Sequence, residues 1–482
     1  SLTLSLAGGV VGVLLAVGAV SWIRSTAAVG APRAEWIGID FRVLAFTLGV
    51  TLAAGLLAGI LPAWRASSVD LQAVLRSAGR TASLRSFWGG NRLQRFLVAG
   101  EVGLAVVLLS GAGLLVKSLI HLSEVNPGFD ARNVLTFNLS MSGRKYAQPK
   151  QLLQSYRNLW ERLSLLPGAK TVGGVSSLPL TNSFAWGPVT VEGRPLGPGE
   201  AFINADWRMV SGRYFEALGI PLLRGRLFDE RDLADSQSVV LVDERMAREL
   251  WQGNDALGKR IRLGGDSMSR WVTVVGVVGG VKQYGLGLDS RIALYLPQSQ
   301  YPVRAMSVVV KCDCEPAGLV AGAKAAVRAI DPDLPVYDVR TMAHRVADSM
   351  ARQRFIAMLL AVFAGLAIAL AAVGVYGVMA FIVGQGRRDI GIRMALGATP
   401  TTIAAMVLKR ALIVAGAGLA CGLAASAVLS RFIGSALDSV HPADGWTLSA
   451  AAAGLLIVAL AASYLPARQA SRVDPATAIR NE

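Results

Sequence analysis

Six long apolar runs divide the chain, and each is long enough to cross the roughly 30 Å hydrocarbon core of a membrane as a helix. They lie at residues 5–23, 43–63, 96–116, 355–383, 403–429 and 446–465. The residues between the third and fourth runs contain no comparable run and are expected to fold outside the membrane. The pattern predicts an α-helical polytopic membrane protein, with six transmembrane helices and an extracytoplasmic α+β domain of two lobes.

The extracytoplasmic segment shows strand and helix periodicities in turn. Alternating or β-branched stretches predict strands at 133–141, 171–178, 305–310 and 336–339, and helical spacing predicts helices at 152–163 and 320–330. These form two strand–helix–strand units, which predict a split α+β layer. Between the units, residues 201–296 predict an inserted second lobe, with short helices near 212–218 and 243–251 and its strongest strand at 271–278.

A short charged segment, residues 385–398, separates the fourth apolar run from the fifth. Gly397 predicts a helix stop, Thr399 an N-cap and Pro400 the first position of the next helix. The segment is therefore expected to be a helix of its own.

Two apolar ridges follow from helical spacing in this segment, Ile390 with Met394 and Ile392 with Leu396. Asp389 and Arg393 lie four residues apart in the favourable order for an ion pair. One ridge can rest on the ends of the membrane helices, whereas the other needs a cover, since burying a large apolar side chain contributes roughly 1.5–3 kcal/mol. The residues leave two interpretations open, a helix lying among lipid headgroups and a docking helix for a soluble partner.

Composition and charge agree with a membrane protein. The chain is 53% apolar and only 17% charged, with a net charge of +16. Arginine and lysine gather between the second and third runs, between the fourth and fifth, and after the last, which places these segments in the cytoplasm by the positive-inside rule. The domain at 121–353 and the loop at 432–445 are then outside. Because the positive charge is concentrated at membrane edges, nucleic-acid binding is not expected.

The first two runs repeat the last two. The sequence LPA occurs at 61–63 and 465–467, and each copy is followed at the same spacing by AS and VD. Gly8 and Gly12 correspond to Gly418 and Gly422, in a spacing of small residues that lets membrane helices pack closely. With a unit of four spans, the chain is expected to be a fragment that holds the second half of one unit and all of another.

Catalytic and metal-binding patterns are sparse. The chain has three histidines and three cysteines, so we expect no cofactor, no metal site and no enzymatic activity in this chain. Cys312 and Cys314 are interpreted first as loop residues, with a strained disulfide or a metal contact as the alternatives. The carboxylates at 229–232 are expected to form a solvated surface. Glu101, inside the third run, is expected to snorkel or to lie at a helix interface rather than carry protons.

Several motifs together resemble a known family. VGVYGV at 373–378, RDIGIRMALGA at 388–398 and the closing LPA at 465–467 resemble the FtsX-like permease domain of MacB-type ABC transporters, and SGRYF at 211–215 resembles their periplasmic core domain. The duplication is similar to that of the duplicated orphan permeases of Acidobacteria. The resemblance divides the chain into two helices of a first permease unit (1–64), a basic cytoplasmic linker (65–95), the first helix of the second unit (96–120), a MacB-like periplasmic core domain (121–353) and an FtsX-like permease domain with three helices (354–482).

The resemblance implies a permease subunit of the bacterial inner membrane. A separate cytoplasmic ABC ATPase would dimerise on ATP, and the membrane helices would transmit the motion to the periplasmic domain, which exports or releases a substrate. The coupling helix at 385–398 would touch the ATPase through Arg387, Arg388, Asp389, Ile390, Gly391, Ile392, Arg393, Met394, Leu396 and Gly397. Membrane lipids are further expected partners. The sequence leaves open the substrate, the engagement of a periplasmic adaptor and outer-membrane channel, and the alternative of an FtsX-like sensor or scaffold that moves no substrate.

Overall fold

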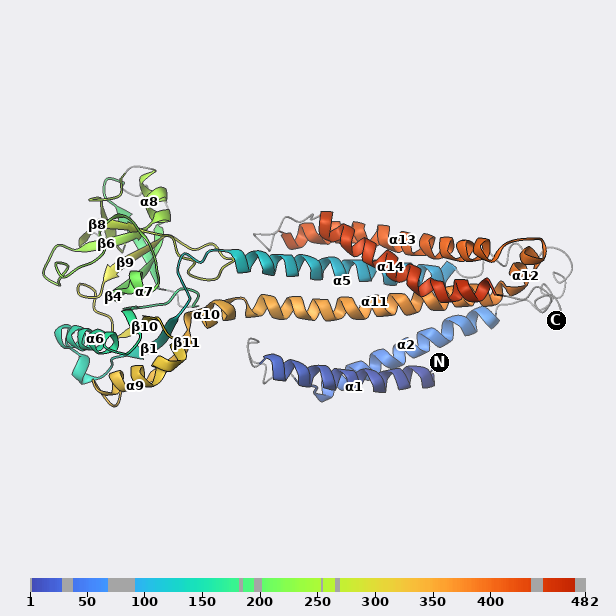
Figure 1. Ribbon diagram of the computed structural model, residues 1–482, viewed down its shortest axis with the longest axis horizontal. Helices are drawn as coiled ribbons and strands as arrows, with labels where there is room; N and C mark the ends of the chain where they lie inside the picture. The colour runs from blue at the N-terminus through green and yellow to red at the C-terminus, as the bar shows by residue number, and fades with distance from the viewer. Residues whose placement is uncertain are drawn as a thin grey trace. The chain divides into compact units, whose positions relative to one another are not determined.

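The computed structural model describes residues 2–27, 38–67, 92–181, 185–194, 202–252, 255–264, 269–434 and 445–472 (Figure 1). The chain forms two compact units, a helical one from Ser1–Ile120 with Ala351–Glu482, and a mixed α/β one from His121–Met350. Most of the predicted linker at 65–95 and of the outer loop at 432–445 lies outside the described residues.

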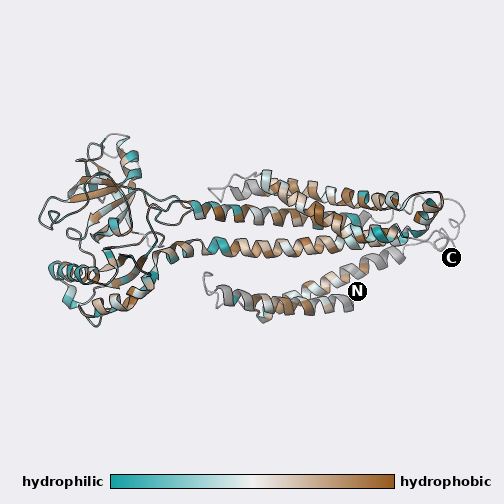
Figure 2. Ribbon diagram, in the orientation of Figure 1, coloured by the Kyte–Doolittle hydropathy of each residue, from teal (hydrophilic) through white to brown (hydrophobic). Residues whose placement is uncertain are grey.

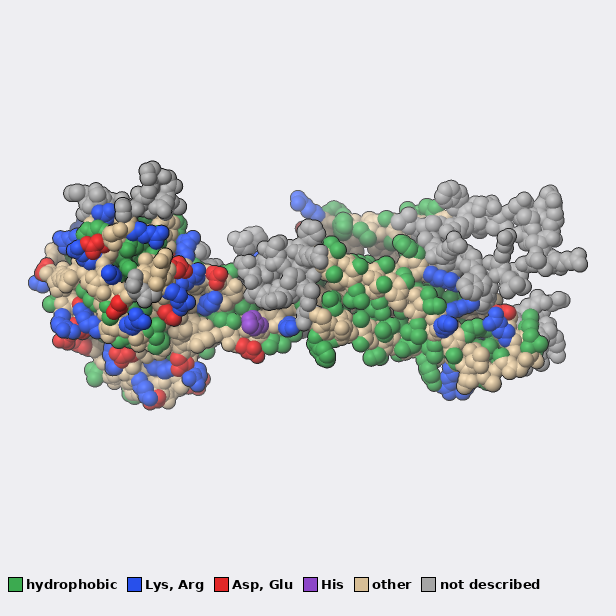
Figure 3. Space-filling model, turned by 90° about the horizontal axis from the view of Figure 1, so that it is seen from above, with side chains coloured by type: hydrophobic (Ala, Val, Ile, Leu, Met, Phe, Trp, Pro, Cys, Tyr) green, Lys and Arg blue, Asp and Glu red, His purple; other side chains and the backbone are tan. Residues whose placement is uncertain are grey.

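Long apolar helices make up the helical unit (Figure 2). They are α1 (Leu2–Ala27), α2 (Phe41–Ser67), α5 (Arg92–Glu124), α11 (Ala351–Gln385), α13 (Pro400–Gly434) and α14 (Gly445–Ala470). Within the described residues, four of them, namely α5, α11, α13 and α14, are long and apolar enough to cross a membrane. The apolar stretches of α1 and α2 are shorter, at Ser5–Ser21 and Phe41–Leu56. The predicted six spans are thus supported for four, and Figure 3 shows how apolar the helical surface is.

Small side chains hold the four spanning helices together. On α11 the buried alanines Ala357, Ala364 and Ala371 recur every seven residues, the spacing of a left-handed helix pair. Ala451 and Ala459 of α14 are buried in the same way. Since lipid tails are as apolar as leucine, close packing of small residues contributes to helix association here.

Glycines of α13 bring its backbone close to that of α5. A Cβ added to Gly422 would lie 2.7 Å from the carbonyl oxygen of Gly103, and one added to Gly418 would lie 2.9 Å from the Cβ of Val102. The first pair of predicted packing glycines is placed differently, because Gly8 and Gly12 have nothing within 4 Å of such a Cβ among the described residues.

Gly9 is an α1 glycine that faces α2. An added Cβ there would lie 2.9 Å from the Cγ2 of Thr51. Gly8 and Gly12 thus meet no packing partner among the described residues, and their packing role stays a prediction. The neighbouring glycine lies 100° further round the helix, and sequence spacing alone did not distinguish the two faces.

The second unit combines an extended sheet with short helices. Its strands are β1 (Val134–Ser140), β2 (Ala169–Val175), β3 (Trp186–Val191), β4 (Ile203–Gly212), β5 (Leu222–Gly225), β6 (Val239–Asp243), β7 (Arg260–Leu263), β8 (Trp271–Val278), β9 (Ala293–Pro297), β10 (Ala305–Cys312) and β11 (Val336–Thr341). Its α-helices are α6 (Pro149–Ser164), α7 (Tyr214–Ala217), α8 (Glu244–Trp251), α9 (Val320–Arg328) and α10 (Met342–Ser349). The strands and helices predicted from periodicity are confirmed within a few residues at each end.

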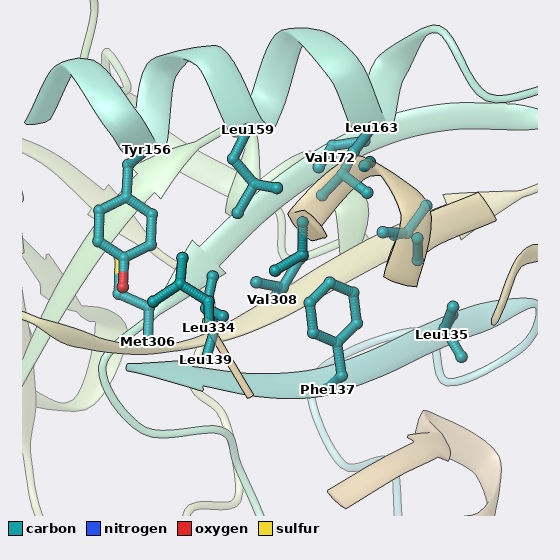
Figure 4. Close-up of a cluster of buried hydrophobic side chains, with 14 of the residues drawn as sticks. Leu135, Phe137, Leu139, Tyr156, Leu159, Leu163, Val172, Met306, Val308 and Leu334 are labelled. Atoms are coloured by element: carbon teal, nitrogen blue, oxygen red, sulfur yellow. The ribbon is translucent and has the colours of Figure 1, made fainter. Parts of the chain in front are cut away.

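The two strand–helix–strand units form one layer, in the strand order β11-β1-β10-β2. Helix α6 covers it, and Tyr156, Leu159 and Leu163 point from the helix toward Phe137 of β1 and Val308 of β10 (Figure 4). The helical spacing of the apolar residues on α6 and the alternation on β1 place both sets on facing surfaces, which is why this core could be predicted locally.

The second lobe is a closed barrel rather than an open insertion. Strand β4 pairs with β2 and so continues the first layer, and the ring β4-β3-β7-β8-β6-β9 closes because β9 also pairs with β4. Buried residues such as Val240, Ile261, Val272 and Leu294 fill the ring. Closure removes the free edges of these strands. It depends on pairings between distant segments, which no local sequence pattern predicts.

One acidic segment differs from its prediction. Asp232 is only 4% exposed and receives both terminal nitrogens of Arg226, at 2.7 and 2.8 Å. The predicted solvated surface therefore describes Asp229, which pairs with Arg231 at 2.7 Å, but is wrong for Asp232.

We expect Gly422→Val to weaken the packing of α13 on α5. Its side chain would overlap the backbone of Gly103, and overpacking typically costs about 1–3 kcal/mol. Gly416→Val is the matched control, since the same change on the same helix meets nothing within 4 Å. Thermal unfolding of the detergent-solubilised chain measures both, and equal midpoints would contradict the close approach.

We expect Asp243→Asn to remove a pH dependence of stability. Asp243 caps α8 by accepting from the Met246 amide at 2.7 Å, and its burial raises the carboxyl pKa from 3.8 to about 7. The unfolded chain then releases this proton at lower pH than the folded chain, so the wild type loses stability as pH rises from about 4 to about 7, on the order of 4 kcal/mol in all.

The asparagine variant keeps the capping oxygen and carries no charge. It should therefore match the wild type near pH 4 and exceed it at pH 8, as measured by urea unfolding across pH. Asp235→Asn, at an exposed position, is the control and should leave the pH dependence of stability as in the wild type. A wild type whose stability is flat over this range would refute the assignment.

Candidate functional site

The segment between the membrane helices α11 and α13 forms the short helix α12, Arg387–Ala395. It ends in a Schellman motif, with the Ala398 amide donating to the Arg393 carbonyl at 3.0 Å and the Gly397 amide to Met394 at 3.1 Å. Gly397 has φ of +95°, a conformation that costs glycine little. The predicted stop is confirmed.

Helix α13 restarts at Pro400 as predicted. The Thr399 hydroxyl accepts from the Thr402 amide at 3.4 Å, and the Thr399 carbonyl accepts from Ile403 at 3.2 Å. The predicted bounds of 385–398 were too wide, since Gln385 still belongs to α11 and Gly386 separates the two helices.

One of the two apolar ridges of α12 is buried and the other is exposed. Ile390 is 2% exposed and lies with Met379 and Val383 of α11 and Val407 of α13, and Met394 packs at the edge of the same cluster. On the other ridge Ile392 is 43% exposed and Leu396 83% exposed. One ridge therefore fixes the helix, while the other has no cover in the described chain.

A polar strip runs between the ridges. Asp389 pairs with Arg393 at 3.1 Å, as the spacing predicted, and Arg393 also contacts the sulfur of Met406 at 3.0 Å. Both groups are partly exposed, so the pair contributes little to stability and chiefly orients Arg393. Arg387 is exposed and Gly391 is buried, whereas the side chain of Arg388 lies outside the described residues.

The structure also places residues that the sequence did not connect. Glu101 of α5 lies directly against Gly374 of α11, where an added Cβ would overlap its carboxylate. Of the two roles predicted for Glu101, the helix interface is therefore the one observed. Gly103 was missed as the partner of Gly418 and Gly422. Its only signal was a glycine in an apolar helix, which does not specify a partner.

In the α/β unit, helix α10 is tied to the sheet by buried charge. Arg345 is 7% exposed and pairs with Asp338 at 2.8 Å, and its Nε donates to the Thr136 hydroxyl at 2.8 Å. Arg340 of β11 reaches forward to Asp348 of α10 at 2.7 Å. Removing one partner of a buried pair is costly, so α10 is held firmly at β1 and β11.

In the described part of the chain, no three histidine, cysteine or acidic side chains lie close enough together to hold a metal ion. What the described site offers is a surface of two apolar side chains beside charged ones, which suits protein contact.

Comparison with known families decides the identity. Residues 124–330 match the MacB-like periplasmic core domain, and residues 361–475 match the FtsX-like permease C-terminal domain. The chain is an FtsX/MacB-type ABC permease. Helix α12 lies inside the matched FtsX-like segment, between helices α11 and α13. The matched periplasmic segment contains the closed barrel and the split layer except for its edge strand β11.

Curated relatives of this permease include the macrolide export ATP-binding/permease protein MacB of Chromobacterium violaceum, 27% identical over 61% of this chain and 46% of the relative. MacB 1 of Aeromonas hydrophila is 29% identical over 57% of this chain and 43% of the relative. The pyoverdine export protein PvdT of Pseudomonas syringae is 27% identical over 60% and 46%. The permease thus spans less than half the length of these relatives in the matched part.

Solved structures similar to this permease include the periplasmic region of MacB from Actinobacillus actinomycetemcomitans, at 19% identity and a TM-score of 0.31, covering 45% of this chain and 93% of that one. The extracellular domain of the noncanonic ABC-type transporter YknZ matches at 16% identity and a TM-score of 0.28, covering 42% and 100%.

Alanine substitutions on the two ridges should have different effects on stability, because one ridge is buried and the other is exposed. We expect Ile390→Ala to lower stability by roughly 2–5 kcal/mol, because it empties a buried site, and Ile392→Ala to change it by no more than about 0.5 kcal/mol. Both are isoleucines of one helix and thus control for helix propensity. Unfolding of the solubilised permease measures both, and similar losses for the two would mean that the second ridge is buried as well.

Proposed function

We propose that this permease couples ATP hydrolysis by a separate cytoplasmic ATPase subunit to a conformational change of its periplasmic domain, which exports or releases a substrate. The observation that carries the proposal is the division of α12 into a buried ridge at Ile390 and an exposed ridge at Ile392 and Leu396. A helix anchored on one side and apolar on the other is suited to receive a push from a partner and pass it to the helices beneath.

The partner surface is expected to be an apolar groove with acidic groups at its rim. Ile392 and Leu396 would fill the groove, and the exposed Arg387 and Arg393 would face the acidic rim. The anchored side meets α11 and α13 through Ile390, so a displacement of α12 acts on both spans. This is the input side of the proposed mechanism.

The output side uses the segments that enter the α/β unit. Helix α5 is continuous from Arg92 to Glu124, and Leu122 near its end is buried, with its Cδ2 only 2.9 Å from where a Cβ on Gly287 would lie. The return segment is not one continuous helix, because α10 ends at Ser349 with Met350 as its C-cap before α11 begins. A stiff α5 and a clamped α10 would deliver motion to β1 and β11.

The proposal includes an inner-membrane location with the His121–Met350 unit in the periplasm, contact with membrane lipids, and delivery to a periplasmic adaptor and outer-membrane channel where the envelope has them. The relatives carry names for macrolide and pyoverdine export. Because the matched part is less than half of each relative, those substrates are not assigned to this chain. The permease itself is proposed to hydrolyse no ATP.

We expect Ile392→Asp and Leu396→Asp each to weaken binding to the ATPase subunit about tenfold or more, since each loses roughly 1.5–3 kcal/mol of apolar burial and 1.4 kcal/mol is tenfold in affinity. Co-purification of the full-length permease with its candidate ATPase, followed by ATP hydrolysis of the complex, measures the effect. Unfolding midpoints should stay at the wild-type value.

Thr401→Asp is the matched control. It adds the same charge at an exposed position of the neighbouring helix start, where a carboxylate is favourable. It should leave binding and hydrolysis intact. A complex that survives both ridge variants would reject α12 as the coupling element and favour a sensor or scaffold that moves no substrate.

A further inference from the structure

Two cysteines of the α/β unit meet at the end of strand β10. Cys312 is its last residue, and the chain then bends at Asp313 and Cys314. Cys312 is buried and Cys314 is half-buried, and both are free thiols. The bend brings the Cys314 carbonyl within hydrogen-bonding distance of the Cys312 thiol.

Each of the two sulfurs is held by contacts with the backbone around the bend. The Cys312 thiol donates to the Cys314 carbonyl at 3.0 Å and to the Asn133 carbonyl at 3.4 Å. The Cys314 sulfur lies over Gly168, 3.0 Å from where a Cβ would be. Replacing that glycine would therefore displace the thiol.

The bend is also held from outside. The Asp313 amide donates to the Gly168 carbonyl at 3.0 Å, and the Asp313 carboxylate pairs with Lys170 of β2 at 2.6 Å. The main-chain register shifts at the same place, between Lys311 and Cys312. The backbone bond and the ion pair thus hold the bend between the two cysteines independently of the sulfur contacts.

We propose that Cys312 and Cys314 are a redox-active pair that forms a disulfide when the domain faces an oxidising compartment. Residues 124–330 match a periplasmic domain family, and periplasmic thiols within reach of each other are oxidised by disulfide-donating proteins. This inference uses the proposed location but not the proposed ATPase coupling.

The oxidant required is a protein disulfide, which reacts with the two cysteines in two thiol–disulfide exchange steps. The thiolate of the more accessible Cys314 attacks one oxidant sulfur and forms a mixed disulfide, which releases the first oxidant thiolate. The Cys312 sulfur then attacks Cys314, forms the intramolecular bond and releases the second. Two electrons and two protons pass to the oxidant, which leaves as a dithiol.

The reduced and oxidised forms differ in their contacts. Bond formation removes the thiol hydrogen that Cys312 donates to Cys314 and Asn133, so the end of β10 loses these ties and gains a covalent one. Burial raises the pKa of the Cys312 thiol, which makes it a poor leaving group when a reductant attacks Cys314. The oxidised pair should therefore be slow to reduce.

Acid-quenched alkylation of the full chain in cells tests the pair directly. Trypsin cleavage after Lys311 and Lys324 yields one peptide, residues 312–324, that contains both cysteines. We expect this peptide to carry no maleimide in cells quenched without reductant and a maleimide on both cysteines after reduction. Cys421, on α13, should be labelled in both samples and serves as the internal control.

A second arm separates geometry from compartment. The purified, reduced full-length chain is exposed to oxidised glutathione, and the same peptide should lose its alkylation sites without acquiring glutathione. Label on both cysteines in each arm, or a stable glutathione adduct, would overturn the proposal. If the purified chain forms the disulfide but both cysteines are labelled in cells, the pair is not oxidised in cells and the domain lies in a reducing compartment. That result would overturn the proposal and leave ATPase binding by α12 untouched.

Discussion

The burial of Ile390 at the junction of α11 and α13 is the contact on which the functional reading of this permease depends. A helix with 3.6 residues per turn cannot pack both of its i, i+4 ridges onto one surface. Once Ile390 and Met394 occupy the inner face, Ile392 and Leu396 must turn outward. The exposed apolar pair is thus a geometrical consequence of the anchor.

In the proposed mechanism, the same anchor would pass a displacement of α12 to both neighbouring helices. Helices α11 and α13 meet α12 through one buried side chain, and α13 in turn approaches α5 through Gly418 and Gly422 without intervening side chains. Glu101 of α5 against Gly374 of α11 adds a further contact. In the proposed mechanism, close backbone contacts of this kind move one helix with another, because there is little side-chain volume to absorb a displacement.

Local patterns predicted what local physics determines. The caps at Gly397 and Thr399, the ridge at Ile390, the ion pair of Asp389 with Arg393 and the core face of α6 follow from side chains a few residues apart, and the structure contains them all. The predicted role of α12 as an ATPase contact stays a prediction. Contacts between distant segments were not predictable: closure of the barrel through β4 and β9 and the choice of Gly9 over Gly8 depend on a partner surface that appears only once the chain is folded.

In the proposed mechanism, the α/β unit would receive force at its layer rather than its barrel. Both segments that lead toward the helical unit end on or beside the split layer, with β1 following α5 and α10 clamped to β1 and β11 by Arg345. The barrel joins that layer through β4, which pairs with β2 along one side and closes the ring along the other. A shift of the layer would therefore reach the barrel through a hydrogen-bonded strand instead of a loop. Because a strand transmits tension through backbone hydrogen bonds on both sides, β4 is the element through which the two lobes would change shape together.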